Sequence, residues 1–398
     1  MDPDISKHQR PIKILLVSSS SGSRGGGELY LLYLGRALAQ RGHKVTLWAS
    51  EHPRMDELSN SFSCFGDVFR APYQNTYDHP ARSLATRFNF NVSGSVASEW
   101  QSLRPEVIHI NKQNLEDGLD LLRAATLSGI PSICTIHLTQ SAKYLGAQFA
   151  TLRDLVSRKA LKKYRGPLVT VLDSRKKDLA RFIGEEERIF VVPNGVPLFD
   201  LAKLRGLRRI KRAELQLDTT DFLLLALGRM VPQKRPMLFL ELAEKIYAKI
   251  PQARFLWVGD GNLGNDWDQW VAQRNLGKVI RRISWQPDVQ PFLCAADAFL
   301  HVAEYEGLPL ALLEAMSAGL PCAVKENLLA EMPFLNPTNS ISVGDDDSWI
   351  APLADHELLA KIGEAGHKIV EEQFTHRRMA ELYEPLYRKL IAESAAKV

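Results

Sequence analysis

The sequence lacks any long hydrophobic run. No apolar stretch in the chain approaches the roughly 18 residues that a membrane-spanning helix needs. The first residues, MDPDISKHQRP, are polar and lack the apolar core of a secretory signal. Together with the scattered cysteines, these absences predict a cytoplasmic protein, and a basic helix at residues 152–165 leaves open a place at the inner face of the membrane.

The chain also contains few cysteines and carries a small net charge. The four cysteines, Cys64, Cys134, Cys294 and Cys322, are far apart, so we expect neither a disulfide nor a zinc site. The net charge of +4 is too small to indicate nucleic-acid binding. The remaining composition, 45% hydrophobic and 24% charged over 398 residues, is that of a soluble protein long enough for two domains.

Short β-rich runs alternate with helical patterns along the chain, which is typical of parallel α/β sheets. The first series of expected strands covers residues 12–17, 44–49, 106–110, 131–136 and 168–172. The second covers residues 222–228, 254–259, 279–284, 298–302 and 321–325. Between them, residues 201–217 are a charged stretch that we interpret as a connector. The sequence therefore predicts two Rossmann-like domains with a cleft between them, and ligands beyond the carboxyl ends of the strands.

The segment EYEGLPLALLEAMSAG, residues 304–319, is almost wholly apolar apart from its acids. The proline and glycine that bracket it predict a helix over about 309–318. Glu306 then lies in the loop that enters the helix, and Glu314 tilts back toward this loop. Because a helix N-terminus attracts phosphate and buried acids need hydrogen-bond partners, the pair indicates a nucleotide-sugar site. The alternative, which remains open, is that Glu306 and Glu314 bind nothing and are both exposed to solvent.

A glycine-rich stretch, SSSSGSRGGGE at residues 18–28, follows the first expected strand. Gly25, Gly26 and Gly27 allow backbone N–H groups to crowd around an anion. The spacing does not match GxGxxG, which weakens a dinucleotide-dehydrogenase interpretation, although Glu51 could in principle bind a ribose. We expect a phosphate-binding turn, with a flexible loop as the alternative.

Further polar groups follow other strands. GRMVPQK, residues 228–234, carries Arg229 and Lys234, two cations suited to clamp a diphosphate leaving group. TIHLTQ places His137 at a strand end, pointing into the expected cleft, and a structural histidine fits the pattern equally well. VPNGV, residues 192–196, has the composition of a turn that ends the first domain.

The segment LRDLVSRKALKKYRG, which begins at Leu152, has cations at helical spacing beside an apolar stripe. The cations are Arg158, Lys159, Lys162 and Lys163, and the stripe is Phe149, Leu152, Leu155, Val156, Ala160 and Tyr164. A helix over residues 152–165 could dock on an anionic membrane surface. The pattern favours the alternative, a helix that covers the first sheet and has a solvated outer face.

Taken together, these segments resemble the GT-B glycosyltransferases of the large retaining family 4, the glycosyl transferases group 1. The motifs GGGE, RGHKVTL, TIH, VPNGV, GRMVPQK, VGDGN and EGLPLALLEAMSAGLP occur in the expected order over nearly the whole chain. The most specific is the last, with two glutamates separated by seven residues in an apolar setting.

The resemblance implies an α/β fold of GT-B type, with two Rossmann-like domains whose parallel sheets face each other across an interdomain cleft. We expect an N-terminal, acceptor-side domain over residues 1–197 and a nucleotide-sugar donor domain over residues 198–375. A C-terminal helix at about 376–398 is expected to pack back on the first domain.

The resemblance also implies roles for single residues. Arg229 and Lys234 would hold the donor diphosphate, Glu306 the transferred sugar and Glu314 the nucleoside ribose. The expected catalytic residues are Glu306, His137, Arg229 and Lys234, and the expected donor-binding residues are Gly25, Gly26, Gly27, Arg229, Lys234, Gly307, Leu308 and Glu314. No metal site is expected.

The chain departs from the family pattern at two places. The glycine that often follows the family's lysine is Arg235 here, and the glycine pair expected after the second acid's helix is replaced by KENLLAE, residues 325–331. Glu331 is a candidate for the family's later acid. These departures concern local donor contacts and leave the expected fold unchanged.

The expected function is transfer of a sugar from a nucleotide diphosphate donor of UDP or GDP type to a sugar, lipid-linked or other acceptor hydroxyl, with retention and without a metal or other cofactor. Polysaccharide, glycolipid or glycoconjugate synthesis is the expected setting. Two alternatives remain: a nucleotide-sugar epimerase or hydrolase that uses His137, and a non-catalytic nucleotide-sugar-binding subunit.

Overall fold

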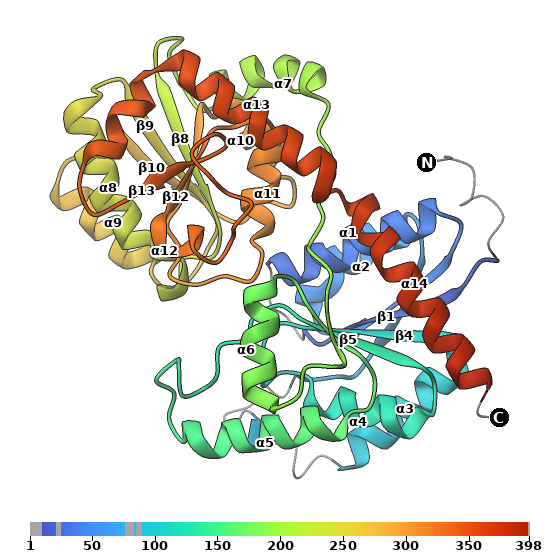
Figure 1. Ribbon diagram of the computed structural model, residues 1–398. Helices are drawn as coiled ribbons and strands as arrows, with labels where there is room; N and C mark the ends of the chain where they lie inside the picture. The colour runs from blue at the N-terminus through green and yellow to red at the C-terminus, as the bar shows by residue number, and fades with distance from the viewer. Residues whose placement is uncertain (1–9, 21–24, 76–82, 85–89, 397–398) are drawn as a thin grey trace. The chain divides into compact units, whose positions relative to one another are not determined.

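A computed structural model of the protein describes residues 10–20, 25–75, 83–84 and 90–396. The chain divides into two compact units, unit 1 (Met1–Asn194 and His376–Val398) and unit 2 (Gly195–Thr375) (Figure 1). The VPNGV segment spans the first crossing from one unit to the next. Val196 N donates a hydrogen bond to Phe374 O over 2.8 Å, so the chain enters and leaves unit 2 at adjacent points.

A seven-stranded sheet forms the centre of unit 1, in the order β3-β2-β1-β4-β5-β6-β7. The strands are β1 (Lys13–Ser18), β2 (Lys44–Ser50), β3 (Asp67–Ala71), β4 (Val107–Lys112), β5 (Ser132–Ile136), β6 (Leu168–Thr170) and β7 (Ile189–Val191). The helices are α1 (Gly26–Gln40), η2 (Pro53–Met55), α2 (Asp56–Ser63), α3 (Phe90–Leu103), α4 (Leu119–Ser128), α5 (Ala150–Lys163), α6 (Asp173–Ile183) and α14 (His376–Ala395).

Both faces of this sheet are covered. In β4, Ile108 and Ile110 belong to the apolar core that α3 and α4 complete. His109, between them, points to the opposite face and contacts Tyr387 of α14. Because successive side chains of a strand point to opposite faces, this alternation places helices on both sides of the sheet.

Unit 2 contains a six-stranded sheet in the order β10-β9-β8-β11-β12-β13. The strands are β8 (Phe222–Leu227), β9 (Ala253–Val258), β10 (Ile280–Ile283), β11 (Ala298–His301), β12 (Cys322–Lys325) and β13 (Ile341–Val343). The helices are α7 (Leu201–Glu214), η5 (Pro232–Lys234), α8 (Pro236–Lys249), α9 (Gly264–Gln273), α10 (Gln290–Ala295), α11 (Leu310–Ser317), α12 (Glu326–Leu329), η6 (Ser348–Ala354) and α13 (His356–Gln373). The strand pairs of both sheets are parallel, which confirms the predicted α/β class.

Strand order reverses once in each sheet. In unit 1 the chain proceeds from β1 outward to β3, then returns to β4 beside β1. In unit 2 it proceeds from β8 to β10, then returns to β11 beside β8. In open α/β sheets such a reversal separates the two loops at the carboxyl ends of the central strands and leaves room for a ligand.

Three strands were not predicted from the sequence: β3, β7 and β13. Each lies at an edge of its sheet, and none is longer than the five residues of β3. An edge strand has one unpaired side and less apolar character, so its sequence signal is weak. Among the described residues, no helix combines the length and apolar character needed to cross a bilayer.

The stretch predicted as a connector is largely helical. Its residues form α7, which is capped by Asp200. The Asp200 carboxylate accepts hydrogen bonds from the N–H groups of Ala202 and Lys203. From this helix, Arg212 reaches Asp297 over 3.0 Å and Arg208 also pairs with it. These arginines point inward and hold α7 on unit 2.

Helix α5 also differs from the prediction. The apolar stripe expected to face the sheet is only partly buried, because Phe149, Leu152 and Leu155 are exposed. Asp154, Ser157 and Leu161 are the buried residues of the helix instead. The outer face of α5 is therefore more apolar than a solvated helix requires.

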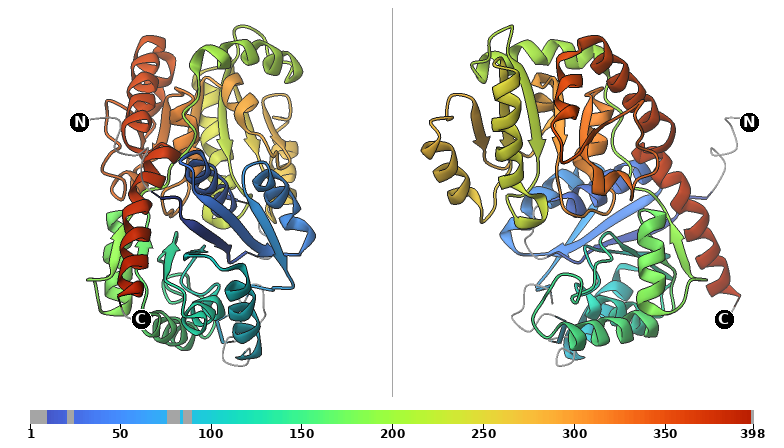
Figure 2. Two further views of the ribbon diagram at one scale, coloured as in Figure 1. Left: turned by 90° about the vertical axis from the view of Figure 1, so that its right-hand side faces the viewer. Right: turned by 60° about the vertical axis from the view of Figure 1, so that its left-hand side comes forward.

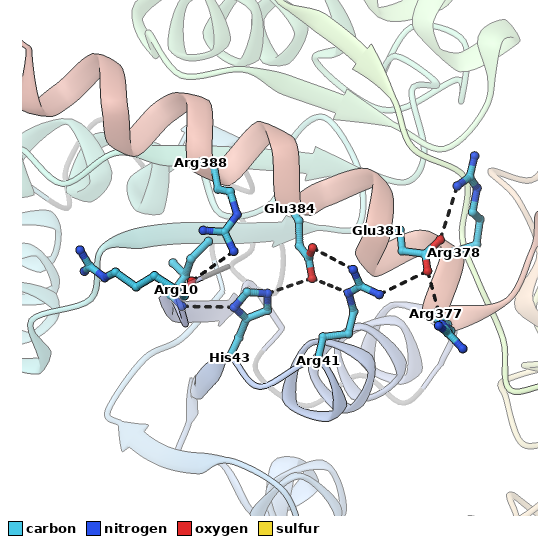
Figure 3. A network of polar contacts seen from close by, with 9 residues as sticks. Arg10, Arg41, His43, Arg377, Arg378, Glu381, Glu384 and Arg388 are labelled. Atoms are coloured by element: carbon cyan, nitrogen blue, oxygen red, sulfur yellow. Dashed lines mark hydrogen bonds and ion pairs between the residues drawn. The ribbon is translucent and has the colours of Figure 1, made fainter. Parts of the chain in front are cut away.

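Helix α14 runs along the edge of unit 1 (Figure 2) and packs there through a network of ion pairs, which Figure 3 shows from close by. Glu384 accepts hydrogen bonds from Arg41 Nη2 over 3.0 Å and from His43 Nε2 over 2.9 Å. His43 Nδ1 accepts the backbone N–H of Ile12 over 3.2 Å, so its proton lies on Nε2. Burial opposes the charge, but the hydrogen bonds from His43 and Arg41 prevail and lower the pKa of Glu384 to about 2.

The same helix completes a buried polar cluster. His109 Nδ1 lies 2.6 Å from Tyr387 OH, and His109 Nε2 lies 2.8 Å from Thr135 Oγ1. Tyr383 OH bridges Thr135 Oγ1 and Tyr30 OH, each over 2.7 Å. Burial lowers the pKa of His109 to about 3, so the imidazole is neutral at ordinary pH. Since these groups are all buried, removal of α14 would leave several of them unpaired.

Replacing Glu384 should destabilise the protein. We expect Glu384→Gln to lower the free energy of unfolding by roughly 1–3 kcal/mol, because Arg41 and His43 lose a charged acceptor. The matched control is Glu393→Gln on the same helix, where the exposed ion pair with Lys389 should contribute less than about 0.5 kcal/mol. Denaturant unfolding of the variants and the parent protein measures both effects.

The contribution of Glu384 should also depend on pH. Its folded pKa of about 2 lies below its ordinary value of 4.5, so the stabilisation is complete above pH 4.5 and is lost as the pH falls toward 2. The stability gap between the parent protein and Glu384→Gln should narrow over this range. A gap that stays constant down to pH 2 would show that the charge of Glu384 is not the cause.

Candidate active site

The loops that follow β8 and β11 are joined in unit 2. Glu304 N donates a hydrogen bond to Gln233 O over 2.8 Å, and Gln233 Nε2 donates one to Tyr305 O over 3.0 Å. The two loops meet because β8 and β11 are neighbours at the reversal of strand order. GRMVPQK and EYEGLP, which are far apart in the sequence, thus form one surface.

This junction brings Lys234 and Glu306 together. Lys234 Nζ forms an ion pair with Glu306 Oε1, and the Glu306 residue is only 6% exposed. A buried carboxylate would be costly without such a partner. The structure therefore holds one cation beside the acid that the sequence analysis assigned to the transferred sugar.

A histidine that the sequence analysis missed completes this cluster. His301 Nε2 lies 3.6 Å from Glu306 Oε1 and has no hydrogen-bond partner in the part of the chain that the structure describes. Burial lowers the pKa of His301 to about 4 despite the opposing effect of Glu306. The available signal was its place as the last residue of β11, at the carboxyl end of a parallel strand.

Glu314 lies on α11, which confirms the predicted helix apart from its exact ends. Pro309 is the N-cap, and Gly319 has the left-handed φ of 72° that suits a residue just beyond a helix. Glu314 is 3% exposed, so it is not one of two freely solvated acids. The loop residues Gly307 and Leu308, which enter the helix, are also buried.

Arg229, which follows β8, differs from Lys234 in its exposure and in its ion pairing. It is exposed and has no ion pair within the described part of the chain. Its loop is braced by VGDG after β9, because a Cβ at Gly261 would lie 2.2 Å from Met230 O. Position 261 therefore requires glycine, because the two backbones approach closely. This contact fixes the backbone from which the Arg229 side chain extends.

The departure from the family pattern at Arg235 has a backbone consequence. Arg235 adopts the left-handed conformation, with φ 50° and ψ 53°, where glycine is least strained. Its guanidinium lies 3.4 Å from Glu304 Oε1, in the neighbouring loop. The chain therefore keeps the turn geometry that glycine favours and adds an ion pair to the loop junction.

A pocket of about 670 Å³ adjoins the β8 loop in unit 2 and is lined by Pro232 and Arg235, by the start of α8, and by residues at the ends of β12 and β13. Two of its charged groups, Lys325 and Asp345, pair with each other over 2.7 Å. Arg229, Lys234, Glu306 and Glu314 do not line it. The residues predicted from the sequence therefore gather at the junction of the β8 and β11 loops and not in this pocket.

In unit 1, His137 follows β5 and is held by Asn111. Asn111 Nδ2 donates a hydrogen bond to Gly27 O over 3.0 Å, which directs Asn111 Oδ1 to His137 Nε2 at 2.7 Å. Because a carbonyl oxygen can only accept, this arrangement fixes the amide and places the histidine proton on Nε2. His137 Nδ1 is then the unprotonated nitrogen.

The ring of His137 is also packed. Tyr30 meets it edge-on, with ring centroids 4.7 Å apart, and burial lowers the pKa of His137 to about 4. A neutral imidazole is therefore the form present at ordinary pH. Asn111 was missed by the sequence analysis, although it lies one residue before the end of β4, beside β5, which His137 follows.

The glycine-rich turn begins α1. Gly25 is the N-cap, and Gly26 and Gly27 are the first residues of the helix, without a side-chain cap. The predicted phosphate turn also includes residues 21–24, which lie outside the described residues. Within the residues described, no group of three or more potential metal ligands is found.

Comparison with known proteins finds matches for both halves of the chain. Residues 208–328 match the sequence profile of the glycosyl transferases group 1, and residues 24–198 match that of Glycosyltransferase Family 4. A relative from Escherichia coli, the UDP-Gal:alpha-D-GlcNAc-diphosphoundecaprenol alpha-1,3-galactosyltransferase, is 30% identical over 58% of this chain and 59% of its own length. The N-acetyl-alpha-D-glucosaminyl L-malate synthase of Bacillus anthracis is 24% identical over 92% of this chain and 94% of that protein.

The fold is shared with solved structures. HepE of Anabaena in complex with UDP and glucose superposes with a TM-score of 0.73 at 17% identity, covering 97% of this chain and all of that one. The architecture is thus GT-B, and the chain belongs to the group 1, family 4 glycosyltransferases. It spans about three fifths of the length of the Escherichia coli relative.

The state of His137 can be tested directly. We expect its imidazole to titrate near pH 4 in the folded protein, because burial lowers its pKa, and to remain neutral between pH 6 and 8. Nuclear magnetic resonance of histidine-labelled protein, with His137→Gln used to assign the signal, measures this titration. A midpoint at the ordinary value of 6.5 would contradict the buried, neutral state.

Proposed function

We propose that the protein is a retaining glycosyltransferase that moves a sugar from a nucleotide diphosphate-sugar to an acceptor hydroxyl. The observation that carries this proposal is the pairing of Lys234 with the buried Glu306 at the reversal of strand order in unit 2. A cation and a carboxylate at one point suit a substrate whose phosphate is negative and whose reacting sugar becomes positive. The names of the Escherichia coli relative and of the HepE complex make UDP the first nucleotide to test.

Each charged group then has a role. Lys234 and Arg229 neutralise the diphosphate as it leaves, and Glu306 faces the sugar, where positive charge develops. Glu314 accepts hydrogen bonds from the ribose. Gly307 and Leu308 present backbone N–H groups near the start of α11, where phosphate is favoured.

The anomeric configuration would be retained because the acceptor hydroxyl attacks the sugar on the same face from which the leaving group departs. No side chain acts as a nucleophile in this reaction, and a leaving phosphate oxygen takes the acceptor proton. His137, neutral and oriented by Asn111, would contact the sugar as a hydrogen-bonding group. Gly25, Gly26 and Gly27 would approach the phosphates through backbone N–H groups, and the two cations would replace a metal in charge neutralisation.

The proposed setting is the synthesis of a polysaccharide, glycolipid or other glycoconjugate in the cytoplasm, at the inner face of the membrane if the acceptor is lipid-linked. The Escherichia coli relative is named for a diphosphoundecaprenol-linked acceptor, which makes a lipid-linked acceptor the first class to test. A membrane contact through residues 152–165 would bring the enzyme to such an acceptor, but sugar transfer itself does not require it.

A donor screen followed by turnover tests the function. Thermal shift with UDP, GDP and their sugars identifies the donor, and product analysis with candidate acceptors then measures transfer. Consumption of donor without an acceptor would favour the epimerase or hydrolase alternative. Donor binding without any turnover would favour the non-catalytic subunit.

Substitution of Glu306 and of Glu314 should produce different defects, one in turnover and one in nucleotide affinity. Glu306→Gln removes the charge that opposes a cation-like sugar, so turnover should drop while UDP still binds nearly normally. Glu314→Gln should weaken UDP itself about ten- to a hundredfold, because the ribose is common to donor and product. Calorimetric titration of both variants with UDP separates the roles, and equal losses in both would falsify the assignment.

Arg229 and Lys234 should stabilise the negative charge of the leaving diphosphate. We expect Lys234→Ala and Arg229→Ala each to lower turnover on the order of 10²-fold or more, because the leaving charge is then poorly matched. Lys249→Ala, an exposed lysine of α8 in the same unit, is the matched control and should behave as the parent enzyme. Unchanged kinetics in both test variants would remove the diphosphate clamp from the mechanism.

A further inference from the structure

An exposed apolar surface lies on unit 1, on α5 and the loop before it. The green helix α5 forms an outer edge of this unit in Figures 1 and 2. Large hydrophobic residues of the segment are strongly exposed: Tyr144 (67%), Leu145 (42%), Phe149 (77%), Leu152 (47%) and Leu155 (43%). We call these five residues the α5 patch. A cluster of this size on one short segment is unusual for a surface that meets only water.

The inner face of α5 shows that this exposure is built into the fold. Asp154 is buried and accepts the backbone N–H groups of Ala142 and Lys143 over 2.8 and 3.1 Å. Arg153 forms a bidentate pair with Glu116, with distances of 2.8 and 2.7 Å. Polar groups thus fix the helix and its preceding loop from inside, while leucines face outward. Only the first turns of α5 present leucines to solvent in this way, because Leu161 is buried further along and Val156 and Ala160 pack against the core.

Phe149 is held in an uncommon conformation. Its φ of 54° lies in the left-handed region, which is unfavourable for a bulky residue. Its carbonyl accepts the N–H groups of Leu152 and Arg153 over 3.1 and 3.0 Å, so the strained residue starts the helix. The side chain that results is the most exposed of the α5 patch. An observed strained residue that presents an aromatic ring to solvent points to a binding role.

The charge around the α5 patch has one sign. The segment of residues 139–165 contains a single acid, the buried Asp154. Its exposed cations are Lys143, Arg158, Lys159, Lys162, Lys163 and Arg165. Arg158 lies over the ring of Phe182 at 5.2 Å, and the lysines of α5 form no ion pair within the described part of the chain. The surface therefore combines apolar side chains with uncompensated positive charge.

We propose that the α5 patch docks on an anionic lipid surface, with its aromatic and aliphatic side chains inserted between the headgroups and the flanking cations paired with them. Aromatic residues favour the membrane interface, and lysine and arginine are attracted to acidic lipids. A symmetric contact between two copies would bring the same six cations face to face. A nucleic acid would use the cations but would leave the leucines exposed.

Vesicle binding by the full-length protein tests this surface. The probes are phosphatidylcholine vesicles and vesicles of phosphatidylcholine mixed with phosphatidylglycerol, at low and at high salt. We expect sedimentation with the acidic vesicles and release at high salt, because the attraction is screened. No binding to acidic vesicles at low salt would overturn the proposal.

Two variants separate the apolar from the charged contribution. Combining Phe149→Ser, Leu152→Ser and Leu155→Ser should weaken binding on the order of tenfold or more, and so should the triple replacement of Lys159, Lys162 and Lys163 by Gln. The matched control combines Leu207→Ser and Ile210→Ser on the basic helix α7, which are 38% and 55% exposed in the parent. It should bind as the parent protein does.

Three outcomes would overturn the assignment: parent-like binding by both α5 variants, an equal loss in the α7 control, or a parent dimer that the α5 variants convert to monomer without lipid. Thermal unfolding and UDP titration of the variants serve as controls for an intact fold and donor site. The inference goes beyond the proposed function, because vesicle binding needs no sugar transfer. Vesicle binding without any nucleotide binding would refute the proposed function and leave the docking surface intact.

Discussion

The ion pair between Lys234 and Glu306 is the contact on which the account of this protein depends. The carboxylate is buried, so without a cation its charge would be expensive, and without the carboxylate the cation would have no fixed place. Both come from loops that follow neighbouring strands, and the strands are neighbours only because the order of the sheet reverses between β8 and β11. Sheet topology thus determines which charges can act on one substrate.

Unit 1 depends on a different constraint, the return of the chain as α14. This helix supplies Glu384 to a charged network and Tyr383 and Tyr387 to a buried polar one. The second network includes Tyr30, whose ring packs against His137. The C-terminal helix therefore supports the surroundings of a candidate catalytic residue that lies far away in the sequence.

The sequence predicted the parallel α/β class, the central strands and the helix that carries Glu314, because buried strands and an all-apolar helix leave strong patterns. It missed the edge strands β3, β7 and β13, whose short runs are stabilised by pairing on one side. It identified Glu306 and Lys234 but not His301 or Asn111, whose relevance depends on strands that meet only in the folded sheet.

The error on α5 has another cause. Periodicity shows that a helix has an apolar stripe but not which side faces the protein, and here Arg153 and Asp154 found partners inside the fold. The same happens on α7, where arginines point inward to Asp297. Charged residues that satisfy buried backbone groups or acids can thus leave part of an apolar stripe exposed where hydrophobicity alone would predict burial.

The central claim is that unit 2 binds the nucleotide at the junction of the β8 and β11 loops. Hydrogen–deuterium exchange with and without saturating UDP or GDP tests it most directly, since bound ligand slows exchange of the amides that it orders. The account predicts protection, within unit 2, concentrated in residues 228–235 and 304–314. Protection confined instead to residues 236–245 and 343–345, which line the neighbouring pocket, or no protection with either nucleotide, would contradict it.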